Sequence, residues 1–386
     1  MQFSHVIGQR RLIRTIIELV NNNHFPHALL LNGKDGYGNM AFAFAIAQYI
    51  SCENRQKEDA DSLTDSCGDC PSCRKYDKLI HPDLHFIFPN TTTSKVEKDN
   101  ESKLFASEFR DFILKTKGYG SLQDWYDFVG SGNKQGVINV KDADNIVSSL
   151  TMKTFESTYK IMIIWNADKM NQDCSNKILK IIEEPYANTV FILTTEHVEK
   201  ILPTIISRVQ QIKVPPIDND SMRQIIKKEF GDNLTDEKIN QYIDYASGDI
   251  IKLRSYSHEK DLYKMELFVK INRIAMMYRK SAAEISTFAD DFSHLTREEL
   301  KTYMDYFLKM VEQFYLYSIG VKKYIHPLEN FDAKFQNNYP KFITANNLPL
   351  IYKVFQDAQS NIQHNANAKI NIFDMIIKLG KALEKR

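Results

Sequence analysis

Residues 27–50 constrain the fold of this chain more than any other segment, because they have the order strand, glycine-rich loop, helix. The run from His27 to Asn32 is apolar and typical of a buried strand, and Ala41 to Ile50 is an apolar stretch of helical length. Three glycines lie between them, at Gly33, Gly36 and Gly38. The order is that of a phosphate-binding loop in an α/β domain, although a plain tight turn would use the same glycines.

The loop lacks the two residues that a working phosphate loop requires. In the pattern G-x-x-x-x-G-K-[ST], the lysine reaches the terminal phosphates and the hydroxyl holds Mg²⁺. Asn39 stands at the lysine position and Met40 at the hydroxyl position. We therefore interpret the segment as a degenerate nucleotide site and expect no bound ATP. Weak binding of a phosphate by backbone N–H groups at the start of the helix stays open.

Four of the five cysteines gather in a short, loop-like stretch that follows this helix. They are Cys52, Cys67, Cys70 and Cys73. Four thiolates satisfy the coordination of a closed structural Zn²⁺ site and leave no open position for catalysis. An iron–sulfur cluster or uncoordinated thiols are the alternatives, whereas disulfides are not expected in a cytosolic chain. Cys174 stands alone in a helical stretch and is interpreted as an ordinary buried residue.

Alternating strand and helix patterns predict a parallel sheet covered on both faces, followed by helical domains. With 386 residues, the chain is long enough for two or three domains. We place an α/β domain at 1–214, with a zinc module at 51–74 and a mobile insertion at about 90–135. A small helical domain follows at 215–262, after Pro215-Pro216, and a larger all-α domain at 263–386.

The charge balance excludes a chain that wraps nucleic acid through its overall charge, since 50 Lys and Arg face 49 Asp and Glu, a net charge of +1. No apolar run has the length of a membrane span, and the first residues do not have the pattern of a signal peptide. We expect a cytoplasmic protein that does not contact membranes.

Several separated motifs resemble the AAA+ clamp loaders, and most closely the delta-prime subunits of the bacterial DNA polymerase III clamp-loader complex. The most specific are Asn166 to Asn171 and Asn176 to Pro185. Others are Val6 to Gln9, Pro26 to Leu30, Cys67 to Cys73 with His81-Pro82-Asp83, Leu202 to Arg208, and Asn365 to Asn367 with Phe373-Asp374. The resemblance implies an AAA+ P-loop NTPase-like α/β domain with an inserted zinc module, a helical lid domain and a helical collar domain for oligomerisation.

A second pair of residues argues against ATP hydrolysis by this chain. In active members of the superfamily, the strand at Ile161 to Ile164 is followed by Asp-Glu, which hold Mg²⁺ and position the attacking water. Trp165 and Asn166 stand there instead. A tryptophan cannot ligate Mg²⁺, and a neutral amide cannot take a proton. The groups that would bind the metal ion and position the attacking water in phosphoryl transfer are therefore missing.

One catalytic group is retained in the segment that resembles the Ser-Arg-Cys motif of clamp loaders. Ser207-Arg208 matches the motif, and Val209 replaces the cysteine. In the family this arginine projects into the ATP site of a neighbouring subunit and acts in trans as an arginine finger. The alternative is a surface arginine held in a local salt bridge.

The resemblance implies a non-hydrolysing subunit of the DNA polymerase III holoenzyme, a nucleotidyltransferase. It would join gamma or tau and delta subunits in a hetero-pentamer that loads the sliding clamp onto primer-template DNA. One alternative is an active gamma/tau-type ATPase or another AAA+ ATPase. A second is an unrelated zinc-dependent nucleic-acid-binding protein, which the near-neutral charge disfavours.

Overall fold

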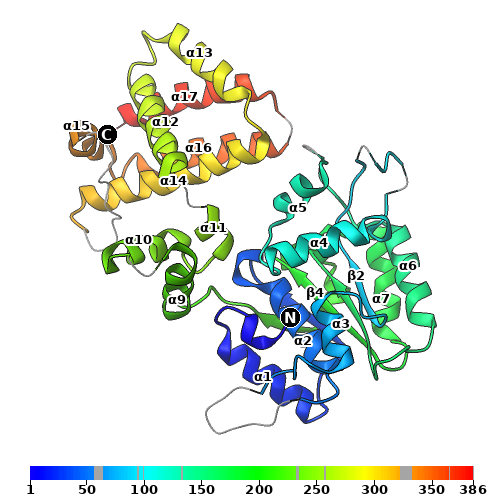
Figure 1. Ribbon diagram of the computed structural model, residues 1–386. Coiled ribbons are helices and arrows are strands. Elements are labelled where there is room, and N and C mark those ends of the chain that lie inside the picture. Colours follow the sequence, from blue (N-terminus) through cyan, green and yellow to red (C-terminus); the bar gives the residue numbers. More distant parts are fainter. Residues whose placement is uncertain are drawn as a thin grey trace. The chain divides into compact units, whose positions relative to one another are not determined.

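The computed structural model describes residues 1–55, 64–93, 95–98, 100–131, 134–231, 234–255, 258–321, 333–364 and 366–385. The chain divides into two compact units, residues 1–255 and residues 256–386, shown in Figure 1. Each unit has its own hydrophobic core. Asn365, part of one C-terminal motif, lies outside the described residues, whereas Phe373 and Asp374 lie in a helix of the second unit.

A five-stranded parallel sheet forms the centre of the first unit, as the alternating pattern predicted. The strand order is β2-β3-β4-β1-β5. The strands are β1 (Ala28–Asn32), β2 (Leu84–Ile87), β3 (Lys160–Ile164), β4 (Thr189–Thr195) and β5 (Gln210–Lys213). Four of the five lie in apolar runs, whereas β5, Gln-Gln-Ile-Lys, is mostly polar and exposed. A sheet without antiparallel pairs needs helical crossovers, which explains the helices between the strands.

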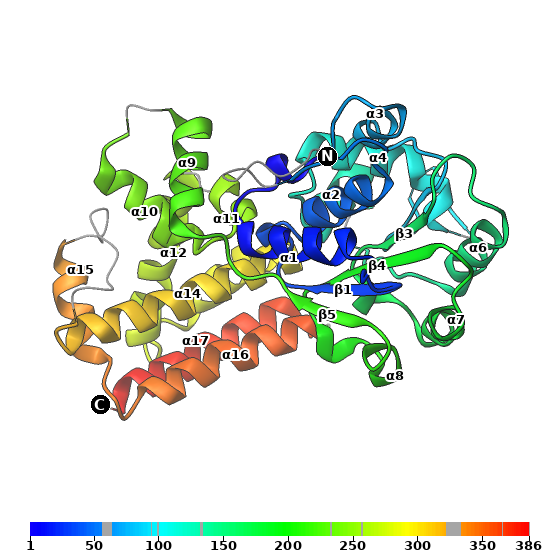
Figure 2. The same cartoon turned by 90° about the horizontal axis from the view of Figure 1, so that it is seen from below.

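Two separate cores cover the two faces of the sheet, because successive residues of each strand point to opposite sides. On one face, Leu29 and Leu31 pack with helices α1 (Arg10–Asn21) and α2 (Asn39–Ser51). On the other, Ala28 and Leu30 pack with α6 (Val140–Thr151), α7 (Gln172–Glu183) and α8 (Pro203–Ile206). Figure 2 shows α1 and α2 along one side of the strands and α7 and α8 along the other.

The insertion is an integral part of the first unit rather than the mobile excursion expected from its polar start and its glycines. Its described residues form a 3-10 turn at Ser102–Phe105 and the helices α4 (Ala106–Thr116) and α5 (Leu122–Val129). Phe109 stacks on Phe88 with ring centroids 3.8 Å apart, and the indole N–H of Trp125 donates to the Pro89 carbonyl at 2.9 Å. Buried aromatic contacts therefore fix this segment at the end of β2.

Three short helices complete the first unit and enclose a small core of their own. They are α9 (Asn219–Phe230), α10 (Asp236–Ala246) and α11 (Ile250–Ser255). Met222, Ile239 and Leu253 are fully buried in this core. We refer to residues 217–255 as the lid helices.

The second unit is entirely helical in its described residues. Its helices are α12 (His258–Met276), α13 (Ala282–Ser293), α14 (Arg297–Ser318), α15 (Ala333–Asn338), α16 (Leu348–Gln363) and α17 (Ala368–Glu384). Aromatic rings fill its core, and the buried amide of Asn272 accepts a hydrogen bond from the Tyr339 hydroxyl at 2.7 Å. No helix in the described part of the chain is both long and apolar enough to cross a membrane.

Candidate functional site

The degenerate phosphate loop lies between β1 and α2, in the strand–loop–helix order that the sequence predicted. Residues Asp35–Tyr37 form a single 3-10 turn, and Gly38 caps α2 with φ of 93°, which glycine adopts without strain. Every residue of α2 is buried, Asn39 and Met40 included. The loop therefore lies between a strand and a helix, as a phosphate-binding loop does, and the helix that follows it is completely buried.

Several backbone donors of the loop are occupied by the chain itself. The N–H groups of Tyr37 and Gly38 donate to the carbonyls of Lys34 and Asp35 at 2.9 and 3.0 Å. The N–H of Asp35 donates to Glu196 Oε1 at 2.7 Å. A phosphate is bound at a helix N-terminus by free N–H groups. With these three donors satisfied internally, the loop offers a phosphate fewer N–H groups than an open phosphate loop does.

Asn39, at the lysine position, has become part of the loop's own structure. Its side-chain amide donates to the Gly33 carbonyl. Met40 is buried in the core on one face of the sheet, so no hydroxyl is present for Mg²⁺. At the lysine position, a phosphate-binding group is therefore replaced by a hydrogen bond within the loop. At the hydroxyl position, a metal-binding group is replaced by a core side chain.

Trp165 and Asn166, which replace the expected Asp-Glu pair, also lie at this end of the sheet. The Trp165 indole N–H donates to Asp35 Oδ1 at 3.1 Å, and its ring centroid lies 5.7 Å from that of Phe109. The backbone N–H of Asn166 donates to the Thr194 hydroxyl at 3.2 Å. An indole ring that bonds to the loop thus stands directly after β3, where the aspartate of an active ATPase is expected from the sequence.

The loop carries a buried carboxyl group where a nucleotide would bring further negative charge. Burial, together with the nearby charge of Glu196, raises the pKa of Asp35 well above its ordinary value. A phosphate would therefore meet acidic side chains instead of a lysine. Among the described residues, these acidic groups do not form a metal-ligand set, and the four-cysteine cluster is the single group that does.

We expect Asp35→Asn to be more stable than the wild type near pH 8, with the difference vanishing near pH 4. A group whose folded-state pKa is raised stabilises the fold below its unfolded-state pKa and loses that contribution as pH rises through the folded-state value. Asparagine keeps an acceptor for the Trp165 N–H without the buried charge. Urea unfolding across this pH range measures the effect. A wild type that gained stability over the variant with rising pH would contradict the assignment.

The four predicted cysteines converge on one point. Cys52 follows α2, Cys67 lies in a loop, and Cys70 and Cys73 belong to the start of α3 (Pro71–Asp77). Their sulfur atoms all lie within 4.8 Å of one another, with Cys52 to Cys67 at 3.7 Å and Cys67 to Cys73 at 4.0 Å. Tetrahedral zinc with Zn–S bonds of about 2.3 Å requires sulfur separations of about 3.8 Å. The donor set fits zinc.

Backbone N–H groups around the cluster donate hydrogen bonds to the sulfur atoms, which favours the negatively charged thiolate form. The N–H of Cys70 donates to the Cys67 sulfur at 3.3 Å, and the N–H of Cys73 donates to the Cys70 sulfur at 3.4 Å. Such bonds offset the charge of thiolates bound to a cation. The fifth cysteine, Cys174, is fully buried in the core on the other face of the sheet.

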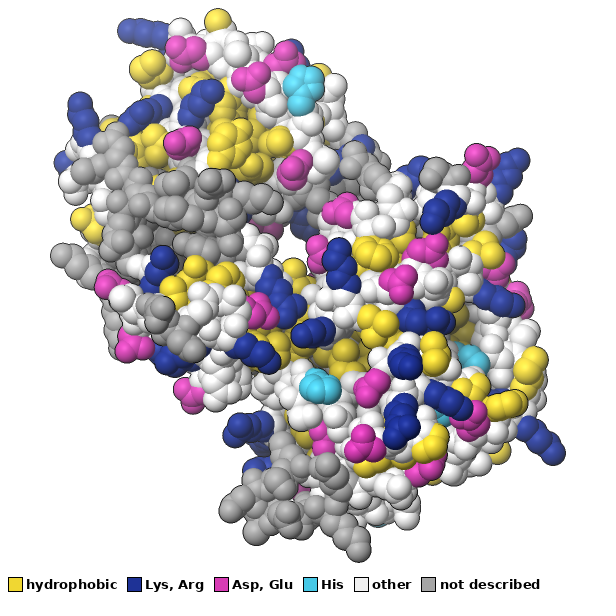
Figure 3. All heavy atoms as spheres, viewed as in Figure 1, with side chains coloured by type: hydrophobic (Ala, Val, Ile, Leu, Met, Phe, Trp, Pro, Cys, Tyr) yellow, Lys and Arg dark blue, Asp and Glu magenta, His cyan; other side chains and the backbone are white. Residues whose placement is uncertain are grey.

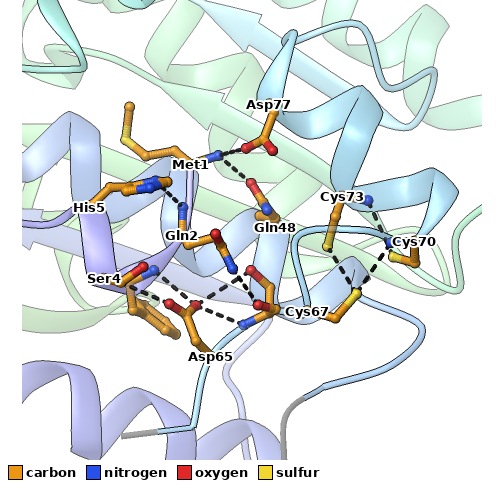
Figure 4. Close-up of polar contacts among 12 residues, drawn as sticks. Met1, Gln2, Ser4, His5, Gln48, Asp65, Cys67, Cys70, Cys73 and Asp77 are labelled. Carbon is orange, nitrogen blue, oxygen red and sulfur yellow. Dashed lines mark hydrogen bonds and ion pairs between the residues drawn. The ribbon is translucent and has the colours of Figure 1, made fainter.

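The four cysteines and the neighbouring Asp65, which we call the cysteine module, hold the first residues of the chain. The sequence did not predict this role. Asp65 accepts hydrogen bonds from the N–H groups of Phe3 and Ser4 at 3.0 and 2.9 Å, as Figure 4 shows. Phe3 in turn packs on Phe42 of α2, with ring centroids 6.1 Å apart. The module therefore joins residues 1–5 to the helix behind the loop. No sequence motif marks Asp65, since its partners are backbone groups.

Arg208 lies at the surface, between α8 and β5. Its Nε is 2.7 Å from Glu183 Oε1, and its Nη1 donates to the Ser207 hydroxyl and to the Thr204 carbonyl, both at 3.0 Å. The side chain remains 40% exposed. Within this chain, Arg208 therefore forms the local salt bridge of the alternative interpretation, and its side chain is accessible.

The sheet register separates Arg208 from the loop of its own chain. Gln210 pairs with Leu29, near the amino end of β1, whereas the loop follows the carboxyl end of the same strand. Arg208 precedes Gln210 and therefore lies at the amino ends of the strands. Arg208 therefore lies at the opposite end of the sheet from the loop of its own chain.

Comparison with known proteins gives a family match. Residues 8–218 match the family model described as DNA polymerase III, delta subunit. The delta' subunit of Bacillus subtilis DNA polymerase III is 24% identical over 209 residues, which cover 54% of this chain and 48% of that protein. The gamma subunit of Buchnera aphidicola from Schizaphis graminum is 25% identical over 249 residues, covering 64% and 54%.

A further relative has the same partial extent. The delta' subunit of Buchnera aphidicola from Baizongia pistaciae is 26% identical over 189 residues, covering 49% of this chain and 43% of that protein. This chain therefore spans about half the length of the curated relatives it matches. A crystal structure of a gamma subunit-related protein from Thermotoga maritima aligns with 97% of the chain at 15% identity, but its TM-score of 0.38 is too low to support an argument.

Proposed function

This chain belongs to the family of DNA polymerase III delta subunits, and on that premise we propose that it is a clamp-loader subunit of the delta-prime type that does not hydrolyse ATP. It would help to load the sliding clamp onto primed DNA during replication, as a cytoplasmic protein. Its relatives named delta', gamma and tau support a role in the clamp loader.

The closed phosphate loop is the observation that supports a non-hydrolysing subunit. Three loop N–H groups bond to the chain itself, Asn39 bonds to Gly33, and Trp165 bonds to Asp35 where the aspartate of an active ATPase is expected. Phosphoryl transfer depends on charges and metal ions around the γ-phosphate, and this site holds an indole and a buried carboxyl group. A gamma/tau-type ATPase or another AAA+ motor is the alternative that these contacts disfavour.

The position of Arg208 supports a catalytic contribution in trans. We propose that it enters the ATP site of an adjacent gamma or tau subunit, with Ser207 and Glu183 holding its guanidinium until then. A planar guanidinium binds phosphate oxygens in a two-pronged manner. The proposed ring is a hetero-pentamer with gamma or tau and delta, assembled through the helices of 263–386 as a collar.

Zinc in the cysteine module would be structural in this proposal. The four sulfur atoms would fill its coordination sphere and leave no open position for a substrate. The bound ion would fold a polar loop that has few apolar side chains to bury, and so hold residues 1–5 against α2.

A zinc-dependent nucleic-acid-binding protein outside clamp loading is the other class that the sequence left open. On the face that Figure 3 shows, Lys and Arg side chains are interspersed with Asp and Glu, without a continuous basic surface. Proteins that bind nucleic acid alone concentrate basic residues on one face. Contact with primer-template DNA is therefore proposed through the assembled ring.

We expect the isolated chain to show no heat of binding with millimolar Mg·ATP, and no ATP hydrolysis above background. The same chain should enter a complex with gamma or tau and delta subunits, measured by gel filtration with light scattering. A purified gamma subunit, which has its own phosphate loop, is the positive control. Tight Mg·ATP binding by the chain alone would favour an active ATPase, and failure to join the complex would reject the clamp-loader role.

A further inference from the structure

A tight turn of the insertion lies against the first turn of the helix behind the loop. The turn is Gly118-Tyr119-Gly120, between α4 and α5. Gly118 has φ of 73°, and a Cβ atom there would lie 2.8 Å from the backbone N and Cα of Ala41. Only glycine permits both this backbone conformation and this approach. The two segments are distant in sequence and have been brought into backbone contact.

The Tyr119 side chain fills the space directly above the N-cap of α2. It is 4% exposed, and a Cβ on Gly38 would lie 2.9 Å from its Cε1 and 3.0 Å from its hydroxyl oxygen. A bound phosphate would occupy this region, in front of the helix N-terminus. The tyrosine ring therefore blocks the place that the degenerate loop once offered to a ligand.

Tyr119 also contacts two other parts of the first unit. Its hydroxyl accepts a hydrogen bond from the N–H of Ile7 at 2.8 Å. The Arg254 guanidinium lies over its ring, 5.7 Å from the centroid, while its Nη2 is 2.7 Å from Glu229 Oε1 in α9. One side chain thus joins the amino-terminal segment, the loop and the lid helices.

The lid helices close on the loop beside this contact. Tyr119 belongs to the same buried cluster as Ile217 and Met222, the core of the lid helices. Asp249, at the start of α11, lies so close to Gly36 that an added Cβ would overlap its carboxylate, at 1.8 Å from Oδ1. Tyr119 fills the space between the lid helices and the loop.

We propose that Tyr119 is a built-in ligand that occupies the loop in place of a nucleotide and holds the lid helices closed on it. The insertion would be the device that makes this subunit rigid without ATP. Its aromatic residues support the arrangement, since Phe112 packs on Trp165 and lies so close to Gly120 that an added Cβ there would be 2.5 Å from its Cζ. The inference rests on the proposed absence of nucleotide from the loop.

Hydrogen–deuterium exchange of the full chain tests this role. In Tyr119→Ala we expect amides of α9, α11 and the loop at 33–40 to exchange at least about tenfold faster, because the contact that closes them is lost. Tyr126→Ala is the matched control. Tyr126 is a buried tyrosine of the same insertion whose hydroxyl bonds to Gly136, so its loss should accelerate exchange only around residues 126–138.

Unchanged exchange of α9 and α11 in Tyr119→Ala, or an equal effect of Tyr126→Ala on them, would overturn the proposal. Tyr119→Leu, which keeps apolar volume and removes the ring and hydroxyl, provides the same test where the alanine variant does not fold. Tyr119→Phe should accelerate exchange chiefly at the Ile7 amide. ATP hydrolysis by the wild type would reject the non-hydrolysing function, a result distinct from unchanged exchange in the variants.

Discussion

Replacing Arg208 by alanine is expected to lower hydrolysis in the ATP site it completes by roughly 10³-fold or more, the scale of arginine-finger loss in GTPases. The guanidinium is exposed, held by Glu183 and Ser207, and placed at the end of the sheet opposite its own loop. Its removal takes a positive charge from a neighbouring site without disturbing any buried contact. ATP turnover by the reconstituted ring, with clamp and primed DNA present, measures the effect.

Two further variants separate catalysis in trans from assembly. Arg208→Lys keeps the charge but loses the planar fork, so we expect it to recover only a small part of the rate. Arg223→Ala removes another exposed arginine of the same unit, one that pairs with Asp236 in the lid helices, and should leave turnover unchanged. An Arg208→Ala ring that assembles and hydrolyses ATP at the wild-type rate would exclude the finger.

Loss of the metal site should cause the largest change in stability. We expect one zinc per chain by metal analysis, and a melting temperature roughly 10 °C lower in Cys73→Ala. Metal binding supplies several kcal/mol of folding free energy, and each kcal/mol shifts the melting temperature by about 2–4 °C in a unit of this size. Fraying of residues 1–5 should accompany the loss, because Asp65 no longer holds them.

Cys174→Ala is the matched control, since it removes an equally buried thiol outside the cluster. It should keep the zinc and cost about 1 kcal/mol, a usual value for a small core truncation. Iron with visible absorption would indicate an iron–sulfur cluster instead. A wild-type protein without bound metal, and with unchanged stability in Cys73→Ala, would show that the cysteines are free thiols.

Local pattern was sufficient to predict the sheet and to identify the side chains that the loop lacks. Four apolar runs and one mostly polar segment became five parallel strands, because an alternation of strands and helices can be satisfied only by crossovers on both faces. Asn39, Met40 and Trp165 indicated a loop without its lysine, hydroxyl and metal ligand, since those functions depend on side-chain identity alone. The spacing of Cys67, Cys70 and Cys73 likewise indicated a metal site before any geometry was known.

The residues that close the loop could not be predicted in this way. Glu196 and Asp249 carry no motif, and Tyr119 lies in a segment whose glycines suggested mobility. Each meets the loop from a different element, by an approach that depends on how those elements pack. Side-chain identity and spacing thus predicted which side chains the loop lacks and which cysteines could share a metal ion. Tertiary structure alone decided what fills the vacated site, because contacts between distant segments follow from the path of the chain and the packing of its cores.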